Sequence, residues 1–245
     1  VRYAGTELLG LEGRARKPFR RSLQMVFQDP FSSLDPRMLV AEILEEGPRA
    51  HGLPPRTAEL LRLVGLDAAA AGRYPHEFSG GQRQRVGIAR ALSVSPEFLV
   101  LDEATSALDI SIQAQILNLL KDLRDSLGLT YLLITHDLGV VRHLADRISV
   151  MYLGRIVESG PAERILGDPR HPYTKALLSA VPSFLGEAKA RIRLTGNVPS
   201  PVNPPPGCPF HPRCQEARPD CSTREPAETS LESARKVRCL LHEPT

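Results

Sequence analysis

Short apolar runs alternate with longer amphipathic stretches along the first 160 residues. Apolar runs of four or five residues predict strands of a buried parallel sheet at residues 23–27, 98–101 and 131–134. Helical spacing of apolar residues is found at residues 39–46, 56–64, 82–92, 112–127 and 138–145. Residues 1–27 otherwise predict short strands joined by turns, and residues 148–152 and 155–158 predict a hairpin. The alternation predicts an α/β fold with a parallel, doubly wound sheet.

Proline and cysteine are concentrated near the C-terminus. Ten of the 22 prolines follow Gly196, and all four cysteines follow Gly207. This shift in composition predicts a main domain over residues 1–160 and an extension with a Pro-rich linker over residues 161–206. A small four-cysteine module is expected over residues 207–245.

Charge and hydropathy exclude some classes of protein. The net charge is only +3, so the chain has no basic arm of the kind that binds nucleic acid. No apolar run approaches the roughly 18 residues that a membrane-spanning helix needs. We therefore expect a globular protein that neither crosses a membrane nor binds nucleic acid.

Two carboxylates follow the apolar strand predicted at residues 98–101. Asp102 and Glu103 are placed where a parallel sheet presents its carboxyl edge. An Asp that holds Mg²⁺ and a Glu that polarises water would suit a nucleotide site there. The alternative is a strand that simply ends in two solvated acidic residues. On this motif alone, the nucleotide-site interpretation and this alternative have about equal weight.

A glycine-containing turn precedes a basic helix. Ser79, Gly80, Gly81 and Gln82 offer a hydroxyl and free backbone N–H groups, which suit a phosphate. The glycines also let the backbone approach such an anion closely. On its own, an ordinary Ser N-cap is the more common explanation.

Three further polar positions lie near strand ends. His136 ends the strand predicted at residues 131–134 and could contact a γ-phosphate, although a lone His is usually structural. Gln28 ends the strand at residues 23–27, and its amide could meet Mg²⁺ or water. Ser106 and Asp109 follow the acidic pair.

Taken together, these motifs resemble those of ABC-transporter ATPases. Gln28, FSGGQ (78–82), LVLDEATSALD (99–109) and ITHD (134–137) resemble the Q-loop, signature, Walker B with D-loop, and switch-His motifs. Phe78 replaces the more usual Leu of the signature. The resemblance covers roughly residues 1–160 and implies a P-loop NTPase-type fold. That fold has a parallel sheet core and a helical signature subdomain at about residues 29–93.

Downstream segments narrow the resemblance to importers of peptides and nickel. MYLGRIVESG (151–160), DPRHPYTKALLSAVP (168–182) and PSPVNPPPGCPFHPRC (199–214) look most like subunits of dipeptide and oligopeptide importers. The resemblance implies a peripheral subunit on the cytoplasmic face of the membrane. It also implies four partner chains: a second ATPase chain, two permease chains and an external solute-binding protein.

The resemblance also implies roles within an ATPase dimer that encloses two ATP molecules. Asp102 would hold Mg²⁺, Glu103 would activate water, and His136 would contact the γ-phosphate. Gln28 would link the metal site to the segment that receives the permease. The remaining residues would act across the dimer: Ser79, Gly80, Gly81 and Gln82 on the partner's nucleotide, and Ser106 and Asp109 at the dimer contact.

The P-loop motif GxxxxGK[ST] does not occur in the 245 residues, because none of the five lysines precedes Ser or Thr. In the family, that motif lies upstream of the position of Val1. The non-Met start favours a truncated piece of a working ATPase. The alternative is a natural chain that serves only its partner's site. Either way, we expect a chain that is inactive alone and exposes apolar sheet surface.

The four cysteines are spaced for a Cys₄ site rather than for a known local motif. Cys208, Cys214, Cys221 and Cys239 are further apart than the paired ligands of most zinc sites. The resemblance implies a [4Fe–4S] cluster, because the importer ATPases carry one on a tail of this pattern. Zinc is the second choice, and four free thiols are the third.

Two other classes of function compete with the transport ATPase. One is a non-catalytic partner that lends only its signature motif. The other is an ABC ATPase of DNA maintenance, which the near-neutral charge and the HPYTKALL segment disfavour. The sequence does not specify the transported solute.

Overall fold

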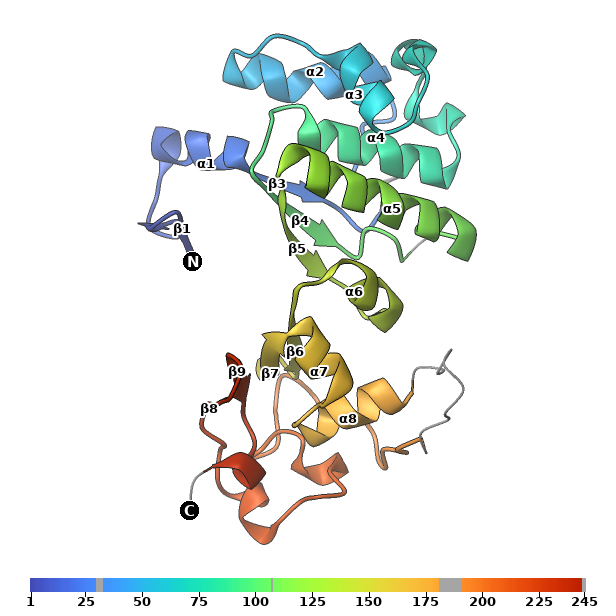
Figure 1. Cartoon of the computed structure of the whole chain (residues 1–245). Coiled ribbons are helices and arrows are strands. Elements are labelled where there is room, and N and C mark those ends of the chain that lie inside the picture. The colour runs from blue at the N-terminus through green and yellow to red at the C-terminus, as the bar shows by residue number, and fades with distance from the viewer. Residues whose placement is uncertain (30–32, 107, 181–190, 244–245) are drawn as a thin grey trace. The chain divides into compact units, whose positions relative to one another are not determined.

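The computed structural model describes residues 1–29, 33–106, 108–180 and 191–243. These residues form two compact units, Val1–His136 and Asp137–Thr245 (Figure 1). The domain boundaries expected from composition remain predictions.

The first unit is built on a parallel sheet. Its strands β3 (Leu23–Val26), β4 (Phe98–Asp102) and β5 (Thr130–Ile134) are arranged with β4 in the centre. Asp102 pairs with Ile134 at the last register position. Because all three strands run in the same direction, their polar carboxyl-terminal neighbours meet at one edge of the sheet.

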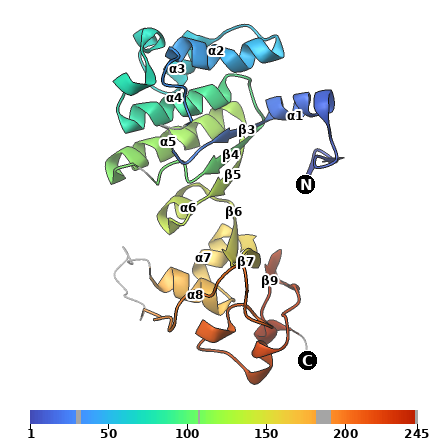
Figure 2. The same cartoon turned by 180° about the vertical axis from the view of Figure 1, so that it is seen from behind.

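Four longer helices complete the first unit: α2 (Val40–His51), α3 (Thr57–Leu63), α4 (Gly80–Leu92) and α5 (Ile110–Leu127). Helix α4 packs against β3 and α5 and also against α2 and α3, so it joins the helical layer to the sheet (Figure 2). Val86 and Ile88 of α4 are fully buried in this junction. The expected helices are confirmed, with ends displaced by a few residues.

Two expectations for the first unit are wrong. Lys17–Ser22 forms a helix, α1, in place of part of the expected strands, and Pro18 at its start has the fixed φ that a first helical turn favours. Strand β5 is not buried on both faces, since Leu132 and Ile134 are 49% and 45% exposed. No described strand pairs with the free edge of β5. The expected short strands are present as β1 (Arg2–Tyr3) and β2 (Thr6–Glu7), which pair as an antiparallel hairpin.

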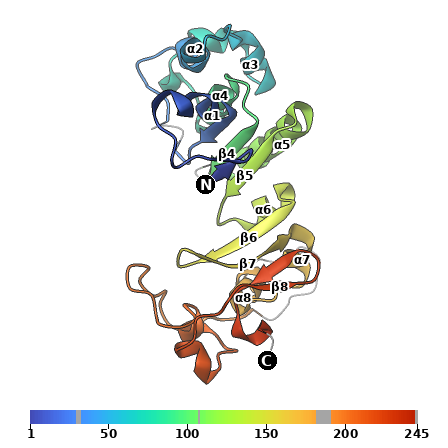
Figure 3. The ribbon, with the colours of Figure 1, turned by 90° about the vertical axis from the view of Figure 1, so that its left-hand side faces the viewer.

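The second unit begins with α6 (Leu138–Leu144) and an antiparallel hairpin of β6 (Arg147–Tyr152) and β7 (Arg155–Pro161). The chain then forms α7 (Ala162–Gly167) and α8 (Pro172–Ser179). Near its C-terminus it returns as β8 (Thr229–Leu231), which is labelled in Figure 3, and as β9 (Arg235–Val237). Strand β9 pairs with β7. The expected hairpin is therefore confirmed, and it belongs to a four-stranded sheet.

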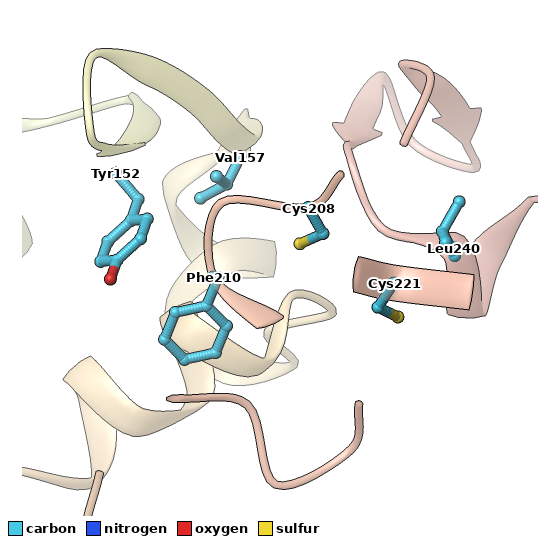
Figure 4. Packing of buried hydrophobic residues seen from close by; sticks show 6 residues of the cluster. All are labelled: Tyr152, Val157, Cys208, Phe210, Cys221 and Leu240. Carbon is cyan, nitrogen blue, oxygen red and sulfur yellow. The ribbon is translucent and has the colours of Figure 1, made fainter. Parts of the chain in front are cut away.

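Residues between Cys208 and Leu240 pack onto this hairpin around one apolar cluster. Figure 4 shows Tyr152 and Val157 of the hairpin facing Phe210, with Cys208, Cys221 and Leu240 beside them. Phe210 is 1% exposed, and its ring meets that of Tyr152 edge-on at 5.3 Å between centroids. The cysteine-containing segment thus shares a core with β6 and β7.

Candidate functional site

The carboxyl edge of the first unit's sheet collects three of the residues singled out from the sequence. Glu103 follows β4 directly, His136 lies two residues beyond β5, and Gln28 lies two residues beyond β3. Each was predicted from its place at the end of an apolar strand. The structure brings their side chains into direct contact.

Both oxygens of the Glu103 carboxylate accept a hydrogen bond. Gln28 Nε2 donates to Oε2 over 2.6 Å, and His136 Nδ1 lies 2.8 Å from Oε1. Since an ionised carboxylate only accepts hydrogen bonds, His136 carries its proton on Nδ1 in this contact. Its Nε2 is left for another partner. The His136 side chain is 74% exposed and Glu103 only 25%, so the carboxylate is the sheltered member of the three.

The backbone at Glu103 is strained. Its φ is +44°, in the left-handed region that costs a residue with a Cβ about 1–2 kcal/mol. The Glu103 N–H donates to the Ile134 carbonyl over 2.9 Å, which extends the β4–β5 pairing by one residue. The Ser106 hydroxyl and N–H both donate to the Glu103 carbonyl. These bonds hold the carboxylate at the sheet edge and place Ser106 in the same turn.

Asp102 precedes this turn and is half-buried. Its carboxylate forms no hydrogen bond or ion pair with any residue in the described ranges. A carboxylate without such a partner among the described residues, at the carboxyl edge of a parallel sheet, has oxygens that suit a hard cation such as Mg²⁺.

The start of α4 carries the Ser-Gly-Gly-Gln motif. Ser79 is the N-cap of α4: its Oγ accepts from the Gln82 N–H, and its own N–H donates to Gln82 Oε1 over 3.0 Å. This reciprocal capping fixes the first turn of α4. Ser79 and Gln82 are exposed, so the motif faces outward and is not gathered with Glu103 by any contact within the described residues.

The packing of α5 against α4 explains why one of the two glycines, Gly81, has no side chain. A Cβ on Gly81 would lie 2.5 Å from Ile112 Cγ2, which is far inside van der Waals contact. A Cβ on Gly80 would lie 3.7 Å from Leu108 Cδ2, an ordinary contact. Asp109, the exposed residue at the N-terminus of α5, is next to this junction in sequence.

Arg90 supports the site, and motif analysis missed that role. Its guanidinium lies 5.7 Å from the centre of the Phe27 ring and donates to the Ser33 carbonyl. Burial lowers the pKa of Arg90. Arg90 of α4 therefore contacts the segment on both sides of Gln28. The only sequence signal was a basic residue on an otherwise apolar helix face.

The four cysteines lie in the second unit and form no disulfide. Burial raises the pKa of Cys239 to about 11, and the other three thiols reinforce the shift. Four thiols that influence one another are a donor set suited to a soft metal or an iron–sulfur cluster. Among the described residues, however, no group of three or more His, Cys, Asp or Glu side chains is arranged to hold a metal ion.

Comparison with known proteins shows which family the chain belongs to. Residues 1–106 match the ABC transporter family, and residues 157–221 match the family described as "Oligopeptide/dipeptide transporter, C-terminal region". CbiO1 from Clostridium perfringens, part of the ABC transporter complex cbiONQ, has a similar structure with a TM-score of 0.58 and 30% identity. That likeness covers 64% of each chain.

Among relatives, YkfD and AppF of Bacillus subtilis are oligopeptide transport ATP-binding proteins by name. They are 51% and 48% identical to this chain over 252 residues, which cover 99% of this chain and 77% of each relative. The fold and the carboxyl-edge site define an ABC-type ATPase. Within that class, the chain belongs to the family of oligopeptide and dipeptide transporter ATP-binding proteins.

Proposed function

We propose that this chain couples ATP hydrolysis to the import of di- or oligopeptides. The observation that carries the proposal is the Glu103 carboxylate held between Gln28 and His136 at the carboxyl edge of a parallel sheet. The names of the relatives support the peptide substrate. The partners would be a second ATPase domain, two permease chains and an external solute-binding protein.

In this proposal, Glu103 takes the proton of the water that attacks the γ-phosphate. Each of its oxygens accepts one hydrogen bond and keeps a lone pair for the water, and the His136 contact competes with the water for Oε1. If His136 turns toward the γ-phosphate, Oε1 becomes available to the water and the imidazole supplies a donor to the developing charge. The Glu103–His136 contact would then be the resting arrangement of the site.

Asp102 would hold Mg²⁺, which neutralises phosphate charge during phosphoryl transfer. Gln28 would couple the metal site to the helical segment that follows Gln28 in the sequence. Arg90 supports this coupling, because it contacts Phe27 and Ser33 on either side of Gln28. The remaining phosphate contacts come from a GxxxxGK[ST] loop, and the 245 residues contain none. The roles of Asp102 and Glu103 therefore need a P-loop from outside this sequence.

The exposed start of α4 would serve the nucleotide of a facing ATPase domain. Ser79, Gly80 and Gly81 present a hydroxyl and N–H groups at a helix N-terminus, and Gln82 fixes their geometry through the capping box. Ser106 and Asp109 would lie at the contact between the two domains. In the alternative function, this chain is a non-catalytic subunit. Its signature and dimer-contact residues would keep these roles, and Glu103 would have no catalytic role.

The test is Glu103→Gln in the assembled transporter. We expect ATP hydrolysis to fall about 10²–10⁴-fold, because the amide cannot accept the water's proton. ATP-bound, dimerised subunits should accumulate, as measured by nucleotide retention. The matched control is Asp122→Asn on the exposed side of α5, which makes the same chemical change away from the site. Unchanged turnover in Glu103→Gln would remove Glu103 from the role of general base.

We also propose that Cys208, Cys214, Cys221 and Cys239 hold a [4Fe–4S] cluster, with zinc as the second choice. Support comes from the burial of Cys208, Cys221 and Cys239, with Cys214 half-buried, and from the packing of Cys208, Cys214 and Cys221 around one cluster. Anaerobically purified protein should contain about four iron atoms per chain and absorb near 400 nm in a dithionite-sensitive band. Finding one zinc atom and no iron would indicate a zinc site in place of the cluster. Finding neither metal would indicate four free thiols.

We place the subunit at the cytoplasmic face of the membrane through its permease partners. In the described part of the chain, no helix is both long and apolar enough to span a bilayer. Attachment in this proposal therefore depends on protein contacts with the permease.

A further inference from the structure

A second concave site lies in the first unit, lined by charged residues. The cavity has a volume of about 580 Å³ and is formed by α1, the end of α2 and the segment leading into β4. The charged side chains lining it are Arg14, Lys17, Arg21 and Glu97, together with His51. Volumes of 300–1,000 Å³ are typical of sites for small molecules.

This cavity is separate from the Glu103 site. Ser22 and Glu97 line it and directly precede β3 and β4, and the Glu97 N–H donates to the Ser22 carbonyl over 3.1 Å. Gln28 and Glu103 follow the same two strands at their other ends. A strand of five residues separates the two edges by about 15 Å. The cavity therefore lies at the amino edge of the sheet.

Positively charged side chains outnumber carboxylates in the lining of the cavity. Arg14, Lys17 and Arg21 form no ion pair with any carboxylate in the described ranges. Arg21 Nε donates to the Val94 carbonyl over 3.1 Å, which leaves its two terminal nitrogens for other partners. The one acidic lining residue, Glu97, accepts a hydrogen bond from the Tyr3 hydroxyl over 2.7 Å. Three cations against one carboxylate favour an anionic ligand.

His51 and Ser95 also line the cavity, and both are affected by or add to its positive electrostatic character. Burial and the charges of Lys17 and Arg21 lower the pKa of His51, so its imidazole is neutral at neutral pH. Ser95 Oγ accepts from Arg56 Nη1 over 2.8 Å, so the Ser95 hydroxyl proton is available to donate. A hydroxyl donor beside guanidinium and ammonium groups matches the tetrahedral oxygens of phosphate.

We propose that the amino-edge cavity binds the phosphate group of a small anionic ligand through Arg14, Lys17, Arg21 and Ser95. Two guanidinium groups and an ammonium suit the multiple charge of phosphate or pyrophosphate better than a single carboxylate. The site does not depend on the proposed hydrolysis at Glu103, because it shares no residue with that edge.

The experiment follows the titration of His51 by NMR in the 245-residue chain with ¹³C-labelled histidine. His51→Gln assigns the resonance, and the circular dichroism spectrum of each variant checks that it is folded. Inorganic pyrophosphate is the probe, added at constant ionic strength. We expect the pKa of His51 to rise saturably, because a bound anion offsets the field of Lys17 and Arg21.

Variants on one helix provide the matched comparison. Arg21→Gln and Lys17→Gln should each weaken pyrophosphate binding roughly tenfold, since each removes a charge-assisted contact. Arg20→Gln makes the same charge change at the adjacent position, which does not line the cavity, and should leave binding within about twofold. Equal effects of Arg20→Gln and Arg21→Gln would overturn the proposal.

A second arm separates the sources of the phosphate. A rise in the His51 pKa with pyrophosphate assigns a soluble ligand, and a rise only with phosphatidylglycerol vesicles assigns a lipid headgroup. Sodium chloride at matched ionic strength tests for screening alone. If chloride moves His51 as far as pyrophosphate does, or if neither phosphate source moves it, the cavity is not a phosphate site.

Discussion

His171 shows how much one side chain contributes to the second unit. It is 1% exposed, and its Nδ1 accepts a hydrogen bond from the Tyr173 N–H over 3.0 Å. Its own N–H donates to Glu158 over 2.9 Å. Burial is the main cause that lowers its pKa to about 4. The imidazole is therefore buried in its neutral form.

This burial predicts a pH dependence of stability. In the unfolded chain His171 has an ordinary pKa near 6.5, so between pH 6.5 and pH 4 the unfolded state binds more protons than the folded state. The second unit should lose up to about 3 kcal/mol as pH falls through this window and keep full stability above it. Urea unfolding at several pH values measures the effect. In His171→Gln the slope between pH 6.5 and pH 4 should flatten, and an unchanged slope would contradict the assignment.

At the scale of elements, the packing of α4 on α5 depends on one missing side chain. Gly81→Ala would place a Cβ 2.5 Å from Ile112 Cγ2, and the branched Ile112 side chain has little room to turn. We expect the free energy of unfolding to fall by about 1–3 kcal/mol. Chemical denaturation of the purified chain measures it.

Gly80→Ala is the matched control, because its Cβ would make only an ordinary contact at 3.7 Å with Leu108. Ala is also the better helix former, so this variant should be neutral or slightly stabilising. Ile112→Ala combined with Gly81→Ala should recover part of the loss. Equal destabilisation by the two glycine variants would show that the clash is not the cause.

Most elements of the first unit could be predicted because their apolar residues repeat with a clear period. The buried strand β4 and the long helix α5 each lie within two residues of the expected range. Lys17–Ser22 was missed because six residues rich in Lys and Arg carry no helical apolar pattern. The exposure of Leu132 depends on what lies beside β5, which the pattern within β5 does not contain.

Only part of the candidate site could be predicted from the sequence. Gln28, Glu103 and His136 were identified because each follows an apolar strand, and strand ends of a parallel sheet meet at one edge. The contact of Arg90 with Phe27 was not predictable, since it joins residues far apart in sequence that carry no shared motif. For the same reason, the amino-edge cavity gave no signal in the sequence.

At the scale of the whole molecule, a buried ion pair ties the end of the chain to the hairpin. Arg235 of β9 lies 3.2 Å from Glu158 of β7, and their side chains are 5% and 1% exposed. Glu158 also accepts from the N–H groups of Arg170 and His171, so its charge is well satisfied. Asp168 is a second partner of Arg235 at 3.3 Å.

Arg235→Met should therefore destabilise the second unit by about 3–5 kcal/mol, because it leaves a buried carboxylate without its cation. Lys236→Met, the next residue in β9, is the control. Lys236 pairs with Glu228 at 2.8 Å on the exposed face, and its loss should cost at most about 1 kcal/mol. Urea denaturation compares the two. Similar losses would mean that the buried pair has no special part in stability.

The pairing of β9 with β7 also determines the order in which the two units can complete their sheets during translation. All three strands of the first sheet have been made once Ile134 has left the ribosome, so this sheet can form while the rest of the chain is being translated. The four-stranded sheet of the second unit must wait for Lys236 and Val237, which follow the first residue of β7 by just over 80 residues. At roughly 5–20 residues per second, the hairpin stays without its C-terminal strands for several seconds. During that interval, Glu158 has no Arg235 to pair with, and the apolar face around Tyr152 is exposed to chaperones and proteases.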